Sequence, residues 1–129
     1  MANGIQIDQL ADAVNGIFSE YAEFVHEAIV ESVDQTAKDT TQTLKQKSPK
    51  RTGKYAKGWT SSKTASSRLT YEKTVHNKKY YRLTHLLEYG HAKVNGGRTA
   101  AQPHIAPAEQ QAISEFEREL KKGIENGAF

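Results

Sequence analysis

Apolar and small residues recur at steps of three and four through the first third of the chain. This series comprises Leu10, Val14, Ile17, Tyr21, Phe24 and Ala28, with Val25 and Ile29 beside them, and the same face continues with Val33, Ala37 and, two turns later, Leu44. Such steps place side chains on one stripe of a helix. Ser48 and Pro49 then end the helix, because the residue before a proline is pushed out of helical geometry. We therefore predict a helix over about residues 8–47, roughly 60 Å long.

The pattern changes in the middle of the chain, where Ser, Thr, Tyr and Val alternate over about residues 55–77. This alternation predicts two strands of a small antiparallel sheet, at residues 57–64 and 69–76. Helical spacing returns at about residues 80–89 and stops at Gly90. A loop at 91–106 leads to a C-terminal helix at about 107–123, with Pro107 in its first turn. We expect one α+β domain that covers residues 1–129.

The long helix is out of proportion to the rest of a chain of 129 residues. Only 36% of the residues are hydrophobic, so the domain can build only a thin core. So little protein cannot cover the whole apolar stripe of a 40-residue helix. We expect part of the stripe to pack on another subunit.

Charge is strongly segregated along the chain, although the net charge is only +3. Residues 1–36 carry seven acids and no Lys or Arg, residues 37–98 have a net charge of +12, and residues 99–129 have a net charge of −2. The acidic helix of one copy could therefore dock on the basic region of the next. Alternatively, the basic middle could bind nucleic acid, or the segregation could reflect only a solvated surface.

Several classes of protein are disfavoured by what the sequence lacks. It contains no Cys, and therefore neither disulfides nor thiolate metal ligands. No apolar run approaches the length of a membrane span, and residues 1–10 lack the pattern of a signal peptide. We expect the protein to be made and used in a cytoplasm.

The candidates for catalysis or metal binding are weak. His85 and His91 are six residues apart, which points them away from each other on a helix, and His104 follows in a proline-rich loop. We expect these histidines to lie in loops or at a subunit contact rather than to hold a metal. No nucleophile elbow is present, and the middle of the chain, where Glu72 and Glu88 stand alone, lacks the paired carboxylates of glycoside chemistry. We therefore expect no catalytic, cofactor or metal site, and no enzyme.

Nucleic-acid binding is the alternative with a visible signal. The basic stretch from Lys45 to Lys57 has Tyr55 inside it and Trp59 just after it, and aromatic rings beside cations can hold single strands. In this alternative the phosphate contacts are Lys50, Arg51, Lys54, Lys57 and Arg98. However, Trp59 occupies a predicted strand, where packing in a core is its ordinary role.

Three short motifs occur in an order that resembles a known family. The first is Ser-Pro-Lys-Arg-Thr-Gly at 48–53, followed by Gly58-Trp59. The second is His-Leu-Leu-Glu-Tyr-Gly-His at 85–91, followed by Gly-Gly-Arg at 96–98. The third is Gln-Pro-His-Ile-Ala-Pro-Ala at 102–108. Together they resemble a neck and tail-completion family of siphophages, over about residues 8–124.

The resemblance implies a structural protein of the virion, at the head–tail interface of a tailed phage. Such a protein is described as a minor tail component or head–tail joining protein, and it assembles as a ring in the host cytoplasm. Its partners would be other connector or tail-terminator proteins, with DNA in the lumen. From the charge pattern we predict that Glu23, Glu27, Glu31, Lys50, Arg51, Lys54 and Arg98 form the subunit contacts.

Overall fold

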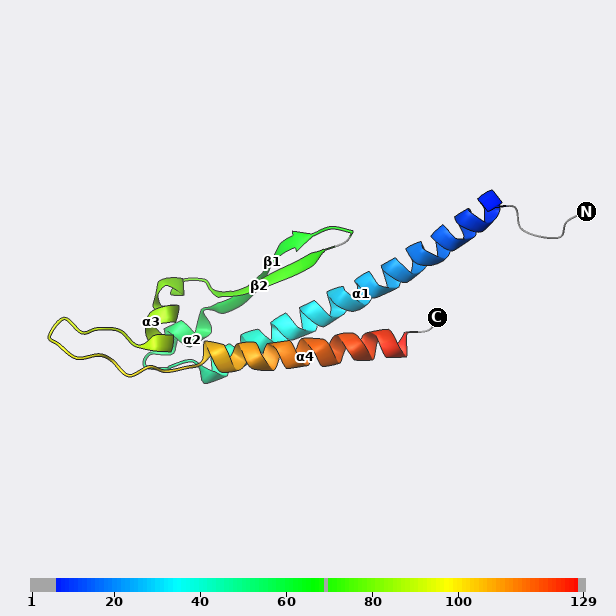
Figure 1. The fold of residues 1–129 in the computed structure, drawn as a ribbon. Coiled ribbons are helices and arrows are strands. Elements are labelled where there is room, and N and C mark those ends of the chain that lie inside the picture. The colour runs from blue at the N-terminus through cyan, green and yellow to red at the C-terminus, as the bar shows by residue number, and fades with distance from the viewer. Residues whose placement is uncertain (1–6, 69, 128–129) are drawn as a thin grey trace, which may run out of the picture.

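The computed structural model describes residues 7–68 and 70–127 and confirms the predicted α+β fold (Figure 1). A long helix, a two-stranded antiparallel sheet, a short helix and a C-terminal helix follow one another along the chain. In order, the elements are α1 (Ile7–Lys47), α2 (Lys54–Lys57), β1 (Trp59–Ser66), β2 (Tyr71–Asn77), η1 (Tyr81–Leu83), α3 (Thr84–Tyr89) and α4 (Ile105–Asn126).

Helix α1 is continuous through its 41 residues, including Gly16, and ends next to Pro49 as predicted. Helix α4 packs against it antiparallel but is only 22 residues long. Its C-terminal end reaches Ala28, whose Cβ lies 3.5 Å from the position that a Cβ on Gly123 would take. The N-terminal part of α1 therefore projects beyond the rest of the molecule (Figure 1).

The sheet differs from the prediction at its start. We predicted a sheet region from about residue 55 with a first strand at 57–64, but residues 54–57 form the short helix α2 and β1 begins only at Trp59. Gly53 precedes it with a left-handed φ of 81°, a geometry that favours glycine, and Tyr55 and Ala56 are buried. Strands β1 and β2 pair from Trp59–Asn77 to Ser66–Tyr71, with an irregularity between Lys63 and Ala65. Leu69, which we placed on the second strand, lies outside the described residues.

The hydrophobic core is small and lies at the end of α1 that carries the sheet. Leu44 from α1, Tyr55 from α2, Trp59 from β1 and Ala108 from α4 are its buried members. The rings of Tyr55 and Trp59 meet edge to face, with centroids 5.8 Å apart. The core occupies only this end, and none of the described residues covers the other end of α1.

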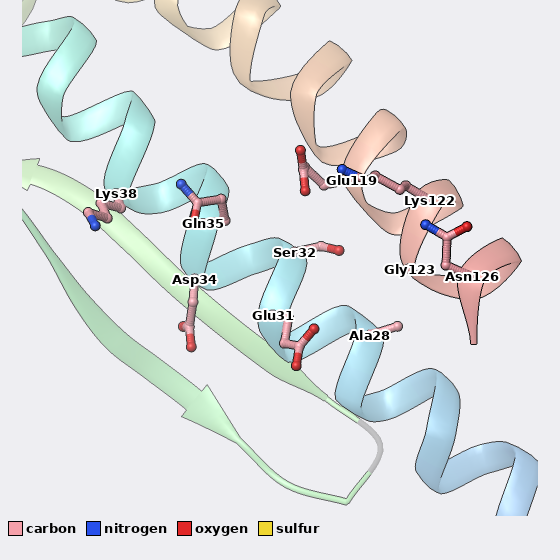
Figure 2. Close-up of a pocket in the computed structure, with 10 residues that line it drawn as sticks. All are labelled: Ala28, Glu31, Ser32, Asp34, Gln35, Lys38, Glu119, Lys122, Gly123 and Asn126. Atoms are coloured by element: carbon pink, nitrogen blue, oxygen red, sulfur yellow. The ribbon is translucent and has the colours of Figure 1, made fainter. Parts of the chain in front are cut away.

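An open groove of about 520 Å³ runs along the contact between α1 and α4 (Figure 2). Small residues line it where the helices are closest, and Ser32 on α1 faces α4. Glu119, Lys122 and Asn126 extend from α4 toward α1 (Figure 2). The remaining lining mixes acids and lysines, so the groove has no dominant charge.

The contact between α1 and α4 contains a pair of interacting carboxyl groups. Burial raises the pKa of Glu115 to about 7, and its hydrogen bond with Asp39 acts in the same direction. That hydrogen bond, together with one from Gln35 at 3.0 Å, lowers the pKa of Asp39. Glu115 therefore shares its proton with Asp39 below neutrality, and two charges face each other above it.

We predict that Glu115→Gln stabilises the protein at pH 8. A carboxyl whose folded pKa is raised contributes stability below its unfolded pKa near 4.5 and loses it as the pH rises to about 7. The glutamine side chain cannot ionise, so the variant does not lose this stability at high pH. Its free energy of unfolding should therefore exceed that of wild type by about 1–2 kcal/mol at pH 8. Urea denaturation at pH 5 and pH 8 measures it. An equal gain in the exposed control Glu117→Gln, or no gain at pH 8, would contradict the prediction.

Candidate assembly site

The projecting part of α1 carries exposed apolar side chains on one side. Leu10, Val14, Ile17 and Phe18, here called the projecting stripe, are between 39% and 66% exposed. Their spacing is that of a helix face that packs against another protein surface. The end of α4 reaches only as far as Phe24, whose ring a Cβ on Gly127 would overlap, so nothing among the described residues covers this stripe.

A second side of α1 is acidic. Glu20, Glu23, Glu27 and Glu31, here called the acidic face, are all exposed, and α1 has no Lys or Arg before Lys38. Like charges three and four residues apart destabilise a helix. Within the described residues, none of the four forms an ion pair. The structure therefore brings Glu23, Glu27 and Glu31 together on one surface.

One acid of the same block is paired inside the chain. Lys73 donates to Asp34 at 2.9 Å, and the Tyr71 hydroxyl donates to the same carboxylate at 2.6 Å. The Tyr71 and Lys73 hydrogen bonds lower the pKa of Asp34. Part of the attraction between the acidic helix and the basic middle is thus used to hold the hairpin against α1.

The basic residues lie at the opposite end of α1 (Figure 1). Lys50, Arg51 and Lys54 are exposed between the end of α1 and the start of α2. The Lys50 amino group donates to the Gln46 carbonyl oxygen at 2.7 Å, which satisfies one of the last carbonyls of α1. Three of the four predicted cations therefore share one end of the molecule.

Beside these cations is a largely apolar hollow of about 270 Å³, here called the apolar hollow. Tyr80, Leu83 and Leu87 line it, together with Arg51 and Lys54. Leu83 is 40% exposed. Aromatic residues and Arg beside apolar surface are the composition that protein interfaces favour.

Arg98 belongs to a different part of the surface. It lies in the loop between α3 and α4, where it forms an antiparallel bridge with Ala92. Its guanidinium donates to the Gly90 carbonyl oxygen at 3.3 Å. Arg98 therefore helps to hold its own loop. It does not belong to the segment between α1 and α2 that carries Lys50, Arg51 and Lys54.

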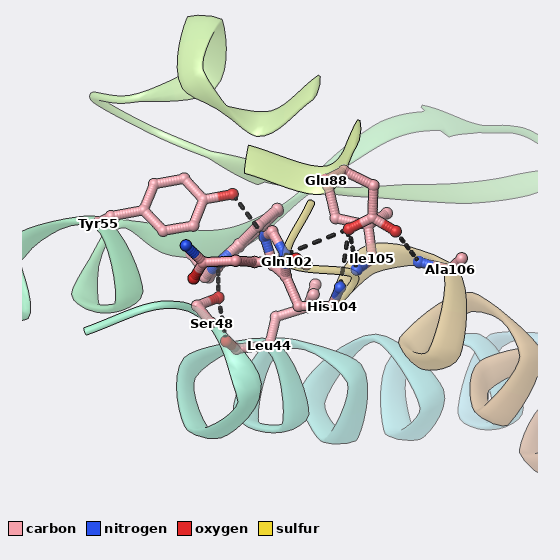
Figure 3. Close-up of polar contacts among 9 residues, drawn as sticks. Leu44, Ser48, Tyr55, Glu88, Gln102, His104, Ile105 and Ala106 are labelled. Carbon is pink, nitrogen blue, oxygen red and sulfur yellow. Dashed lines mark hydrogen bonds and ion pairs between the residues drawn. The ribbon is translucent and has the colours of Figure 1, made fainter. Parts of the chain in front are cut away.

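The loop and the apolar hollow are held by Glu88, which is buried at the end of α3 (Figure 3). One carboxylate oxygen accepts from the backbone N–H groups of His104 and Ile105, both at 2.8 Å, and the other accepts from Ala106 at 2.9 Å. Burial opposes ionisation, but these three donors lower the pKa of Glu88. Glu88 thus caps α4 from another helix, as an anion at a helix N-terminus does.

His104 continues this polar network into the core. Its Nδ1 lies 2.7 Å from the Gln102 carbonyl oxygen, which can only accept, so Nδ1 carries a proton. Its Nε2 lies 2.8 Å from the Tyr55 hydroxyl. Burial, and then the charge of Glu88, raise the pKa of Tyr55 to about 12. His104 lies in the loop before α4 as expected, but it is only 1% exposed, so its burial was not predicted.

The first motif contributes to the same network. The Trp59 indole donates to the Ser48 hydroxyl at 2.7 Å, and the Ser48 hydroxyl in turn donates to the Leu44 carbonyl oxygen. Nearby, buried Asn77 donates to the Tyr55 carbonyl oxygen at 2.8 Å. A Cβ on Gly58 would lie 2.4 Å from the Asn77 side-chain oxygen, so this position requires glycine.

The histidines do not form a metal site in the described part of the chain. His104 is buried in the network, whereas His85 and His91 are exposed. Among residues 7–68 and 70–127, no three side chains of His, Cys, Asp or Glu converge as ligands would. Nor is any described helix long and apolar enough to cross a membrane.

The structure contradicts the part of the nucleic-acid hypothesis in which aromatic rings stack on bases. Tyr55 and Trp59 are 8% and 5% exposed, and both rings pack in the core. They are therefore not available to stack on bases. Any contact with nucleic acid at this end would have to rest on the cations alone.

Comparison with protein families identifies the family of this chain. The model of a family described as "Bacteriophage HK97-gp10, putative tail-component" matches residues 12–90, more than half of the sequence. The chain belongs to this HK97-gp10-like family. A structural role in a bacteriophage tail follows. No curated protein and no solved structure matches the chain.

The HK97-gp10-like match covers α1 from Asp12 onward, together with α2, the hairpin and α3. It includes the motifs at 48–59 and 85–90, whose residues Ser48, Trp59 and Glu88 form the polar network. The motif at 102–108 lies beyond it, although Glu88 binds its backbone. Sequence reasoning missed Asn77 and the buried position of His104, because both depend on residues far away in the chain.

Proposed function

We propose that this HK97-gp10-like protein is a non-enzymatic component of the head–tail joint, where its copies associate head to tail into a ring. The α1 end of one copy would dock on the basic end of the next. The projecting stripe would enter the apolar hollow, and Glu23, Glu27 and Glu31 would face Lys50, Arg51 and Lys54. We propose Arg98 as a contact from the loop to the same neighbour.

The observation that carries this proposal is that the projecting stripe and the basic end with the apolar hollow lie at opposite ends of one elongated molecule (Figure 1), whereas Glu23, Glu27 and Glu31 lie in the middle of α1. A contact between different surfaces of identical subunits repeats, and it closes into a ring when the rotation per subunit allows. A twofold contact through the acidic face would instead oppose like charges. The charge pattern therefore favours head-to-tail association.

The structural role is also supported by how the polar residues are used. Glu88, His104, Ser48 and Asn77 are all engaged with backbone groups or with each other. In the proposed setting the partners are other connector or tail-terminator proteins, and DNA passes through the lumen. The protein would be part of the virion at the head–tail interface, after assembly in the bacterial cytoplasm.

Reversing the acidic face should impair assembly. We expect the triple variant Glu23→Lys, Glu27→Lys and Glu31→Lys to lose most of its oligomer while its thermal unfolding changes little, because all three side chains are exposed. Adding Lys50→Glu, Arg51→Glu and Lys54→Glu should restore part of it, since opposite charges face each other again. Size exclusion with light scattering at low salt measures both effects.

A matched control reverses three exposed acids of α4, Glu109, Glu117 and Glu125, to lysine. This control makes the same change in net charge and should assemble normally. If the isolated chain needs a neighbouring connector protein to close the ring, the same variants are compared by adding that protein, or by complementing a phage that lacks the gene. Normal assembly of the acidic-face variant would contradict the proposed charge contact.

A further inference from the structure

A second hollow adjoins the apolar hollow, with which it shares Lys54 and Tyr80, but its charge is different. It has a volume of about 560 Å³ and is lined by five lysines: Lys45, Lys54, Lys57, Lys78 and Lys79. They come from three places in the fold, namely the last turn of α1, α2, and the segment that follows β2. We call this site the lysine hollow.

The lysine hollow has no compensating charge. No acid is among its lining residues. All five lysines are exposed, and within the described residues none of them forms an ion pair. The nearest acid in the following sequence, Glu88, is buried and bound to the start of α4. Five cations that converge on one concave surface raise the local positive potential and attract an anion with several charges.

The composition of the lysine hollow favours nucleic acid over protein as its ligand. Lysine is depleted in protein interfaces, which favour aromatic residues and arginine, whereas lysine is a common ligand of phosphate. Trp59 contributes to the lining but is only 5% exposed, and its N–H is bound to Ser48. Tyr80 lines both hollows, so the lysine hollow offers five cations beside one half-buried aromatic ring, whereas the apolar hollow also has Leu83 and Leu87.

We propose that the lysine hollow binds the phosphate backbone of DNA. Because the core aromatic rings are not available for stacking, the contact would not depend on base sequence. This inference goes beyond the ring proposal and does not require it, since the test concerns a different set of lysines. With four or five phosphates neutralised, the affinity should fall by a few hundredfold between 50 and 200 mM salt.

Fluorescence anisotropy with a short duplex of random sequence, titrated with the full chain, tests the proposal. The test variant replaces Lys45, Lys57, Lys78 and Lys79 by Gln and keeps Lys54, which also lines the apolar hollow. We expect it to bind roughly 100-fold more weakly at 50 mM salt, with a shallower salt dependence.

The matched control replaces Lys63, Lys93, Lys121 and Lys122, four exposed lysines outside the hollow, by Gln. It has the same net charge and should stay within about threefold of wild type. Equal weakening of both variants would overturn the site, because binding would then follow net charge alone. The absence of wild-type DNA binding at 50 mM salt would also overturn it. If wild type does not bind DNA and the test variant fails to assemble, the lysine hollow is a protein contact instead.

Discussion

Replacing Glu88 by alanine is expected to lower the free energy of unfolding by about 3 kcal/mol. The change removes the acceptor for three backbone N–H groups at the start of α4, and two of the three bonds are 2.8 Å long. Hydrogen bonds to a charged group are stronger than neutral ones, and a buried donor without a partner keeps its desolvation cost. Urea denaturation at pH 7 measures the loss.

Two variants separate the cap from a general effect of losing an acid. Glu88→Gln keeps one acceptor oxygen but loses the charge, so it should cost about half as much. Glu125→Ala, at an exposed position of α4, should change stability by less than about 0.5 kcal/mol. A Glu88→Ala protein as stable as wild type would show that the cap contributes nothing.

The pH dependence of this variant has a definite sign. The pKa of Glu88 is lowered in the folded protein, so its contribution is present above the unfolded pKa near 4.5. That contribution is lost as the pH falls through the folded pKa. The difference between wild type and Glu88→Ala should therefore shrink below about pH 4. This trend is opposite to that of Glu115, whose contribution is lost as the pH rises.

The helices were predictable because their evidence is local. The three-four spacing from Leu10 to Leu44 and Pro49 after it together define α1, and Gly90 ends α3 with a φ of 75°. At Gly90 a Cβ would also lie 2.5 Å from the Thr99 carbonyl oxygen. By contrast, α2 was missed, since its four residues are helical only because Gly53 turns the chain and Tyr55 is drawn into the core.

The candidate site was predictable in part for the same reason. Glu23, Glu27 and Glu31 share a helix face by spacing alone, and Lys50 and Arg51 are neighbours in sequence. Which of the charges pair inside the chain was not predictable. The contact of Asp34 with Lys73 and the bond from Arg98 to Gly90 depend on the packing of the hairpin and the loop. His104 is another such case, since its partners Tyr55 and Glu88 come from different elements.

Cysteine crosslinking can test the proposed head-to-tail contact between the projecting stripe and the apolar hollow. The chain contains no native Cys, so introduced thiols are the only ones present. Phe18→Cys labels the stripe and Leu83→Cys labels the hollow. Both side chains are exposed, at 66% and 40%. A flexible bis-maleimide, applied to the assembled protein or to assembled tails, joins thiols that lie close together without requiring an exact register.

The double variant should give a ladder of covalent oligomers on a denaturing gel, because each copy is joined to two neighbours. Either single variant alone should remain monomeric, and a mixture of the two should stop at dimers. Covalent dimers from Phe18→Cys alone would instead indicate a twofold contact through α1. That result, or a double variant that remains monomeric while the protein is assembled, would contradict head-to-tail association.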